Sequence, residues 1–318
     1  MITIKRFKHT KSEYKAYADI RNAIWTDNPH SVSELKHNDE NWHKDKLFGR
    51  VVAKQDDQMV AIGNYGEPGW LSQEGRYFIS ILVDPQHQNQ GIGGMVFDHI
   101  LEDLKPRNPK VISGDTRENF EQSLHFLEKR GFKLKQRNEI SRLDVQAFDP
   151  IPFERSFEKV KACGIEIQTL AELQKSDPDW LQKMYDFDCE VSVDVPSPAP
   201  VVVPPIEQYK IDAFSGPSFI PEGHLVAVKD GEYVGYSSLH VNESNPELMN
   251  TGFSGTRRSH RRQGICTALK VRAAQFAKDY GAKYILTGNE ENNPMYKLNL
   301  HLGFEPQPAW LSFEKVIQ

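Results

Sequence analysis

Three short glycine-containing segments recur along the chain in the same order and in similar local contexts. The matched glycines are Gly63 (in MVAIGNY) and Gly235 (in EYVGYSS), Gly91 (in NQGIGG) and Gly264 (in RQGICT), and Gly131 (in EKRGFKL) and Gly303 (in LHLGFEP). The offsets between them are 172, 173 and 172 residues. Such a period indicates a duplicated domain, and a chain of 318 residues is long enough for two domains.

Each copy contains the same order of predicted elements. An opening strand (MITIKRF; GIEIQTL) precedes charged helical segments, a pair of strands joined by a polar turn, and a further strand. A glycine-rich loop, a long helix, a strand, a helix ending in Gly-Phe and a last strand (SRLDVQ; LSFEKVI) follow. The apolar residues of the long helices are Ile92, Val96, Ile100 and Leu104 in one copy, and Ile265, Leu269, Ala273, Phe276 and Tyr280, before Gly281, in the other. Their helical spacing predicts one apolar face on each helix that packs against the core of its domain.

We expect a first domain at residues 1–155 and a second at 156–318. The second copy carries a proline-rich insertion near residues 190–222, with five prolines between Val195 and Pro205. Because the insertion precedes a strand pair inside the copy, we expect an extended, polyproline-like surface segment that can line a pocket.

Composition excludes several classes of protein. The net charge of −5 provides no broad cationic field for nucleic acid or anionic lipid. Cys163, Cys189 and Cys266 have no CxxC spacing and the histidines no HxxxH spacing, so we expect no disulfide framework and no metal. No run of about 18 apolar residues occurs. We therefore expect a cytoplasmic monomer or homodimer that engages no membrane and no nucleic acid.

The glycine-rich loops lie between a strand and a helix, where free backbone N–H groups favour an anion such as phosphate. A P-loop would end in Gly-Lys-Ser/Thr, and Gly94-Met95-Val96 does not match. A dinucleotide fingerprint starting at Gly91 would need glycine at position 96 and would follow the first strand of its domain. Both nucleotide-binding alternatives are therefore weak.

Both copies resemble the GNAT N-acetyltransferase superfamily, whose signature is Gln/Arg-x-x-Gly-x-Gly/Ala. The first copy matches it fully from Gln88 to Gly93, and the second runs from Arg261 to Cys266, with cysteine in place of the last Gly/Ala. The resemblance implies an α+β fold with a mixed sheet, built as two tandem GNAT domains that each have a splayed, mostly antiparallel sheet flanked by helices. It also implies acetyl-CoA as co-substrate. Its pyrophosphate would lie on the loop, and its pantetheine arm along the preceding strand, where a bulge is expected (ISILV; FSGTR).

The cofactor-binding candidates implied by this resemblance form one set in each copy. In the first copy they are Leu82, Val83, Gln88, Asn89, Gln90, Gly91, Gly93, Gly94 and Asn119. In the second copy they are Gly255, Thr256, Arg261, Arg262, Gln263, Gly264, Cys266, Thr267 and Asn292.

A later family motif places Asn at the start of a helix, Tyr seven residues on, and then Gly-Phe. Counting back from Gly303 gives Asn292 and Asn299. Counting back from Gly131 gives Phe120 and Leu127, with Asn119 one residue out of register. The second copy is therefore similar to the C-terminal half of mycothiol synthase-like acetyltransferases, in which Asn takes the place of Tyr.

In this family the tyrosine protonates the departing thiolate. Leu127 has no polar group, whereas Asn299 can donate a hydrogen bond to sulfur but no proton at neutral pH. Tyr296, three residues earlier on the helix, could serve as the acid or pack as an aromatic side chain. We therefore predict a catalytic C-terminal copy and a degenerate N-terminal copy. Glu247 and Glu290 are candidate general bases, and a water chain is the alternative.

The segment TRRSHRRQG contains four arginines that could contact coenzyme A phosphates or form a solvated loop. Cys266 is expected to be structural, because no histidine partner follows at a recognised spacing. The predicted function is acetyl transfer from acetyl-CoA to a small-molecule amine by direct attack. The alternatives are a silent acyl-CoA-binding or regulatory module and a protein N-acetyltransferase. The proline-rich insertion favours a small acceptor, whose identity is open.

Overall fold

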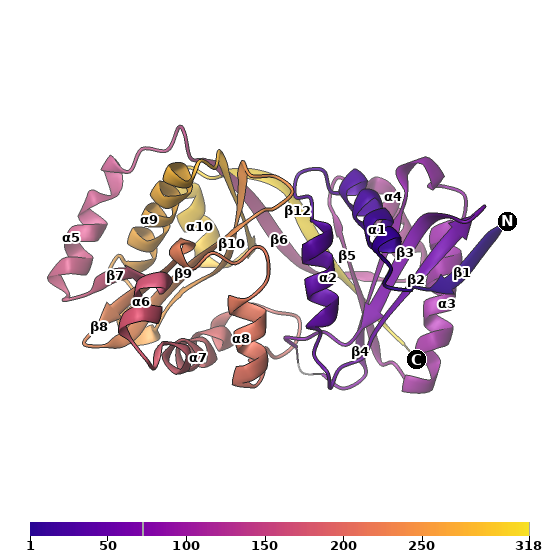
Figure 1. The fold of residues 1–318 in the computed structure, drawn as a ribbon, viewed down its shortest axis with the longest axis horizontal. Coiled ribbons are helices and arrows are strands. Elements are labelled where there is room, and N and C mark those ends of the chain that lie inside the picture. Colours follow the sequence, from indigo (N-terminus) through magenta and orange to yellow (C-terminus); the bar gives the residue numbers. More distant parts are fainter. Residues whose placement is uncertain (72, 318) are drawn as a thin grey trace. The chain divides into compact units, whose positions relative to one another are not determined.

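The computed structural model describes residues 1–71 and 73–317. The chain divides into two compact units, each built from separate stretches of sequence (Figure 1). Unit 1 contains Met1–Arg137, Pro198–Pro200 and the residues from Ala309 onward. Unit 2 contains Asn138–Ser197 and Val201–Pro308.

Unit 1 has a sheet with the strand order β1-β2-β3-β4-β5-β12. Its pairs are antiparallel except β4 with β5. The elements are β1 Ile2–Arg6, α1 Lys11–Ile24, α2 Val32–Glu40, β2 Phe48–Gln55, β3 Gln58–Gly66, β4 Arg76–Val83, α3 Ile92–Leu104, β5 Val111–Arg117, α4 Glu121–Lys129 and the end of β12 Glu305–Val316.

Unit 2 repeats this pattern with the order β7-β8-β9-β10-β11-β6, and only β10 with β11 is parallel. The elements are the end of β6 Lys133–Asp144, α5 Glu154–Ala162, β7 Glu166–Thr169, α6 Leu170–Ser176, α7 Trp180–Val191, α8 Ile206–Phe214, β8 His224–Lys229, β9 Glu232–Val241, β10 Leu248–Thr256, α9 Ile265–Tyr280, β11 Tyr284–Glu290 and α10 Pro294–His301.

The two copies exchange their last strands. Strand β12, from the end of the chain, pairs with β5 from Val111↔Val316 to Arg117↔Trp310. Strand β6, the last strand of the first copy, pairs instead with β11 of unit 2. The units therefore differ from the continuous domains 1–155 and 156–318 expected from the sequence. The local sequence pattern does not predict this exchange of strands, because SRLDVQ and LSFEKVI could each form a strand in either sheet.

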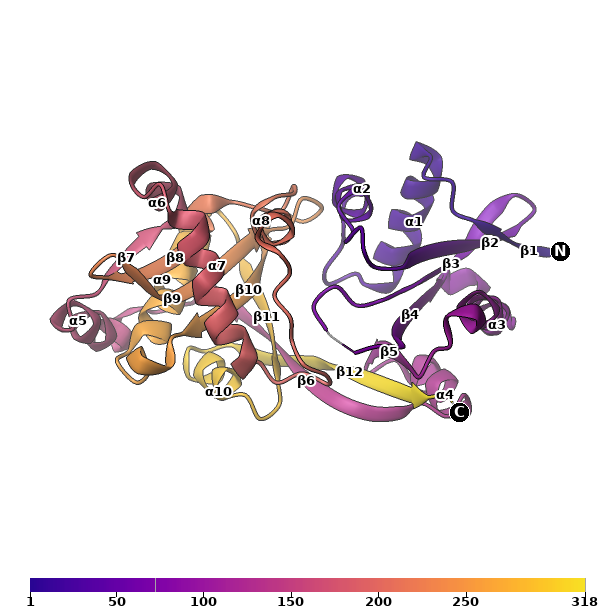
Figure 2. The same ribbon diagram turned by 90° about the horizontal axis from the view of Figure 1, so that it is seen from below.

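Helices cover both faces of each sheet. In unit 1, α3 and α4 pack on one face and α1 and α2 on the other (Figure 2). In unit 2, α9 and α10 cover one face, and α6, α7 and α8 cover the other (Figure 1). The predicted stripes are buried at Ile92, Val96, Ile100 and Leu104, and at Ile265, Leu269 and Ala273. Tyr280 is 52% exposed, because Gly281 ends the helix there.

The proline-rich insertion is only partly extended. Val195 (φ −76°, ψ 119°) and Pro205 (φ −51°, ψ 147°) have extended or polyproline-like backbones, as predicted. Within the same 190–222 region, however, residues Ile206–Phe214 form helix α8. Among the described residues, no helix has the length and apolarity needed to cross a membrane.

Candidate functional site

Helices α3 and α9 begin with the same backbone conformation. Gly91 (φ 80°) and Gly264 (φ 85°) are their N-caps, and both are left-handed, which favours glycine. Asn89 (φ 61°) and Arg262 (φ 63°) are left-handed as well. No side-chain cap satisfies the first-turn N–H groups of either helix, so both helix starts can bind an anion.

The first signature residue ties each loop to the strand before it. Gln88 Nε2 donates to the carbonyl of Val83 at 3.1 Å, and Arg261 Nε donates to the carbonyl of Thr256 at 3.3 Å. Val83 and Thr256 are the last residues of β4 and β10. The shared preference for Gln or Arg at this position therefore has a structural reason: both carry an N–H donor long enough to reach that carbonyl.

The loops differ in their surroundings. A side chain at Gly91 would meet no atom within 4 Å, whereas one at Gly264 would lie 3.3 Å from the carbonyl oxygen of Ser156 in α5. A Cβ at Gly94 would lie 2.8 Å from Nη2 of Arg130, whose guanidinium stacks 3.6 Å from the centre of the Phe126 ring. Gly91 is thus more open than Gly264, which lies near α5, while Gly94 is crowded by Arg130.

In each unit the two parallel strands separate after three residue pairs. Strand β4 pairs with β5 from Arg76 to Phe78, and β10 pairs with β11 from Leu248 to Asn250. The register of β10 with β9 shifts between Thr251 and Ser254, so a bulge forms as predicted. The prediction of a bulge in β4 is wrong. Each residue of β4 from Phe78 to Val83 pairs with one residue of β3, and the register does not shift.

Asn299 is fully buried between α10 and β11. Its Nδ2 donates to Asn289 Oδ1 at 2.6 Å, and its Oδ1 has no partner among the described residues. One of the two Nδ2 hydrogens of Asn299 is therefore engaged with Asn289. Tyr296 lies one turn earlier and is half-buried, and Leu127, at the matching position of unit 1, is buried.

The two motif asparagines lie beside their helices rather than capping them. Asn292 donates from its backbone N and from Nδ2 to Glu290, both at 2.9 Å, and Asn293 is the residue that caps α10. Asn119 is exposed before α4.

The candidate bases are both engaged. Glu247 precedes β10 and forms an ion pair with Lys283 at 2.5 Å, both side chains being about half exposed. Glu290 accepts the two hydrogen bonds from Asn292. Each carboxylate thus has a partner within the chain and keeps lone pairs that could accept a further proton.

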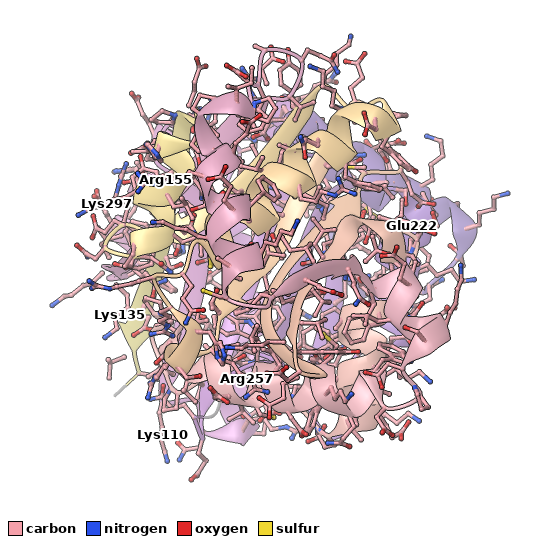
Figure 3. All side chains as sticks on the ribbon, turned by 90° about the vertical axis from the view of Figure 1, so that its left-hand side faces the viewer. Lys110, Lys135, Arg155, Glu222, Arg257 and Lys297 are labelled. Carbon is pink, nitrogen blue, oxygen red and sulfur yellow. The ribbon has the colours of Figure 1, made fainter. Side chains whose placement is uncertain are left out.

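Acidic residues from the end of α7 and the turn after it hold the arginine-rich loop. Arg257, labelled in Figure 3, bonds to Glu190 and donates to the carbonyl of Tyr233 at 2.7 Å. Arg258 and Arg261 both pair with Asp194 and hold the pKa of that carboxyl far below its usual range. The remaining loop candidates, Arg262, Gln263 and Thr267, flank Gly264, and Oε1 of Gln263 is buried without a partner among the described residues.

A buried polar set in unit 2 replaces apolar or small residues of unit 1. Thr256, Cys266, Lys270 and Asn299 stand where unit 1 has Val83, Gly93, Phe97 and Leu127, at the repeat offsets of 173, 173, 173 and 172 residues. Cys266 Sγ lies 2.9 Å from Thr256 Oγ1, and burial raises the pKa of the thiol, which fits a structural role. Lys270 was not predicted as a site residue, although the alignment of the two copies places this charged residue opposite Phe97.

Comparison with known proteins agrees with this geometry. The profile of the acetyltransferase (GNAT) family matches residues 15–132 and 194–304. A peptidyl-lysine N-acetyltransferase, YjaB, from Salmonella typhimurium is 26% identical over 144 residues, which are 45% of this chain and 91% of that protein.

Two solved structures align over nearly the whole chain. A tandem GNAT protein from the clavulanic acid biosynthesis pathway has a TM-score of 0.76 at 16% identity, covering 99% of this chain and 98% of that one. A GCN5-related N-acetyltransferase from Sphaerobacter thermophilus has a TM-score of 0.69 at 15% identity, covering 100% and 96%. At these identities the likeness establishes the fold.

Proposed function

Since the chain belongs to the acetyltransferase (GNAT) family, whose members use acetyl-CoA, we propose that unit 2 transfers an acetyl group from acetyl-CoA to a small-molecule amine by direct attack. The observation that carries this proposal is the combination found in unit 2: an uncapped helix start, a bulged and separating strand pair, and buried Asn299 with an unpartnered oxygen. Unit 1 has the helix start and the separation, but neither the bulge nor the polar residue.

The residues of unit 2 fit the co-substrate in three places. First-turn N–H groups of α9 would bind the pyrophosphate, with Arg262 and Gln263 beside them. The edge of β10 beyond Asn250 would pair with the pantetheine amides. Asn299 would position the sulfur, and Tyr296 lies one turn away. The amine would lose its proton to water, with Glu247 and Glu290, which already have partners within the chain, as the alternative bases.

A small acceptor is favoured by the insertion around α8, which adds a helix and an extended segment to the sheet face opposite α9. The structural neighbour from the clavulanic acid pathway is also a tandem protein. The curated relative acts on peptidyl lysine, so a peptide acceptor is the second candidate and is included in the test.

The proposed function is tested by mass spectrometry of a broad panel of amines and lysine peptides incubated with acetyl-CoA. The key variant is Asn299→Leu, which places the apolar residue of unit 1, Leu127, at the buried position. We expect kcat to fall about 10- to 100-fold, with KM for acetyl-CoA nearly unchanged. Acetylation of no amine by the wild type would refute the transferase, and acetylation of peptides alone would refute the small acceptor.

Asp194→Asn is expected to strengthen binding of coenzyme A severalfold. Its carboxylate pairs with Arg258 and Arg261 and so competes with a phosphate for them. Titration calorimetry with CoA and with dephospho-CoA measures the effect, and Asp186→Asn on α7 is the matched control. Weaker binding by Asp194→Asn would mean instead that Asp194 orients the arginines for the ligand.

A further inference from the structure

Lys270 is the buried lysine of unit 2. Its side chain points from α9 into the protein and is 6% exposed, and it forms no hydrogen bond or ion pair with any residue in the described ranges 1–71 and 73–317. The matching position in unit 1 is Phe97, which packs on Phe126 and Phe132. The fold therefore accepts an aromatic ring at this position, and a lysine is not needed for packing.

Lys270 and Asn299 both contact Phe304. Its Nζ is 5.8 Å from the centre of the Phe304 ring, and the backbone N–H of Phe304 donates to the carbonyl of Asn299 at 3.0 Å. One turn earlier on α9, Cys266 bonds to Thr256 at the end of β10. Phe304 thus connects the two residues, since its ring contacts Lys270 of α9 and its backbone N–H bonds to Asn299 of α10.

Burying an amine without a hydrogen-bond acceptor is costly, and the ring of Phe304 offsets only part of this cost, so an acceptor atom on a bound ligand would stabilise Lys270. Burial lowers the pKa of Lys270 to about 8, and the neighbouring Cys266 thiol opposes this shift. An ammonium with such a pKa is charged at neutral pH and gives up its proton easily. The reaction proposed for unit 2 needs a proton donor. The amide of Asn299 cannot supply a proton, and the other candidate on α10 is the half-buried Tyr296.

We propose that Lys270 is the residue that protonates the departing sulfur in unit 2, an inference that rests on the proposed function. The amine nitrogen attacks the thioester carbon, and the C–S bond then breaks with its electron pair passing to sulfur. The Nζ–H proton moves to that sulfur and gives free coenzyme A. The proton lost by the amine nitrogen passes to water, and water returns a proton to Lys270, so the step balances.

The first test compares Lys270→Met with Lys297→Met, an exposed lysine on α10 that is labelled in Figure 3. We expect Lys270→Met to lower kcat about a hundredfold or more, with KM for acetyl-CoA within threefold of wild type. The wild-type kcat should fall at high pH as Lys270 loses its proton, and this limb should vanish in the variant. An unchanged kcat and pH profile in Lys270→Met would overturn the inference.

The second test does not depend on turnover. Lysines carrying ¹³C at Cε are followed by NMR through a pH titration, and Lys270 is assigned by its absence from Lys270→Met. We expect coenzyme A to shift the Lys270 titration by half a pH unit or more, and desulfo-CoA, which lacks the sulfur, to shift it clearly less. Equal effects of the two ligands, or acetylation of Lys270 itself, would overturn the proton-donor role.

The two tests separate the inference from the proposed function. If Lys270→Met still transfers acetyl groups at the wild-type rate, the proposed function is supported and the proton-donor role of Lys270 is excluded. If the Lys270 titration depends on the sulfur but the protein acetylates no amine, the contact between Lys270 and sulfur is supported and the transferase proposal is refuted.

Discussion

Phe313→Ala, near the end of the chain, is expected to destabilise the fold of residues 1–137 and to leave unit 2 intact. Phe313 is 5% exposed and lies in the unit 1 core, opposite Gly114 in the β5–β12 register. Replacing a buried phenylalanine by alanine costs about 3–5 kcal/mol, a large share of the stability of an ordinary domain. Hydrogen exchange measured by mass spectrometry should show faster exchange in β4 and β5 peptides.

Leu143→Ala should have the reverse effect. Leu143 is 3% exposed in the unit 2 core and pairs with Ile285, although it precedes the boundary expected from the sequence. We expect a loss of about 2–5 kcal/mol, with faster exchange in β10 and β11 peptides. Val316→Ala, at a residue that is 72% exposed, is the control for both. Faster hydrogen exchange in unit 2 for Phe313→Ala and in unit 1 for Leu143→Ala would contradict the strand exchange.

The sequence predicted what depends on local chemistry. Positive φ at Gly91 and Gly264 follows from the glycine-rich loop that leads from a strand into a helix, and the repeat identified both loops. The helix stripes were predictable for the same reason, since Ile92, Val96 and Ile100 recur at helical spacing and are buried.

What the sequence did not predict depends on long-range pairing. The last strand of either copy suits either sheet, so the exchange of β6 and β12 is invisible to local pattern. A bulge at Gly252 and Phe253 and a continuous register in β4 depend on which residues face each other across the sheet. Such information arises only when the strands are aligned.

In the candidate site, too, local features were predicted from the sequence and long-range contacts were not. The loop residues were found from their motif, whereas the engagement of Glu247 by Lys283 and of Arg258 by Asp194 joins residues far apart in sequence. Lys270 is a different case, because a comparison of the two copies already places it opposite Phe97. In a duplicated chain, a charged residue that aligns with a buried aromatic residue of the other copy indicates a role other than packing.

The stability of unit 2 is expected to rise between about pH 8 and pH 10.5 through Lys270. The pKa of this lysine is lowered from 10.5 to about 8 in the folded protein, so in this range the unfolded chain binds the extra proton. The unfolding free energy then increases with pH, by about 1.4 kcal/mol per unit and by about 3 kcal/mol in all, and below pH 8 the penalty is fully present.

Urea unfolding of wild type and Lys270→Met, followed through unit 2 peptides over this pH range, measures the contribution. Subtracting the variant removes the titration of surface lysines and tyrosines, which both proteins share. The wild type should gain about 3 kcal/mol relative to the variant between the two ends of the range. Parallel curves would mean that Lys270 is hydrated in the folded state, and the cost of burying its charge would then disappear.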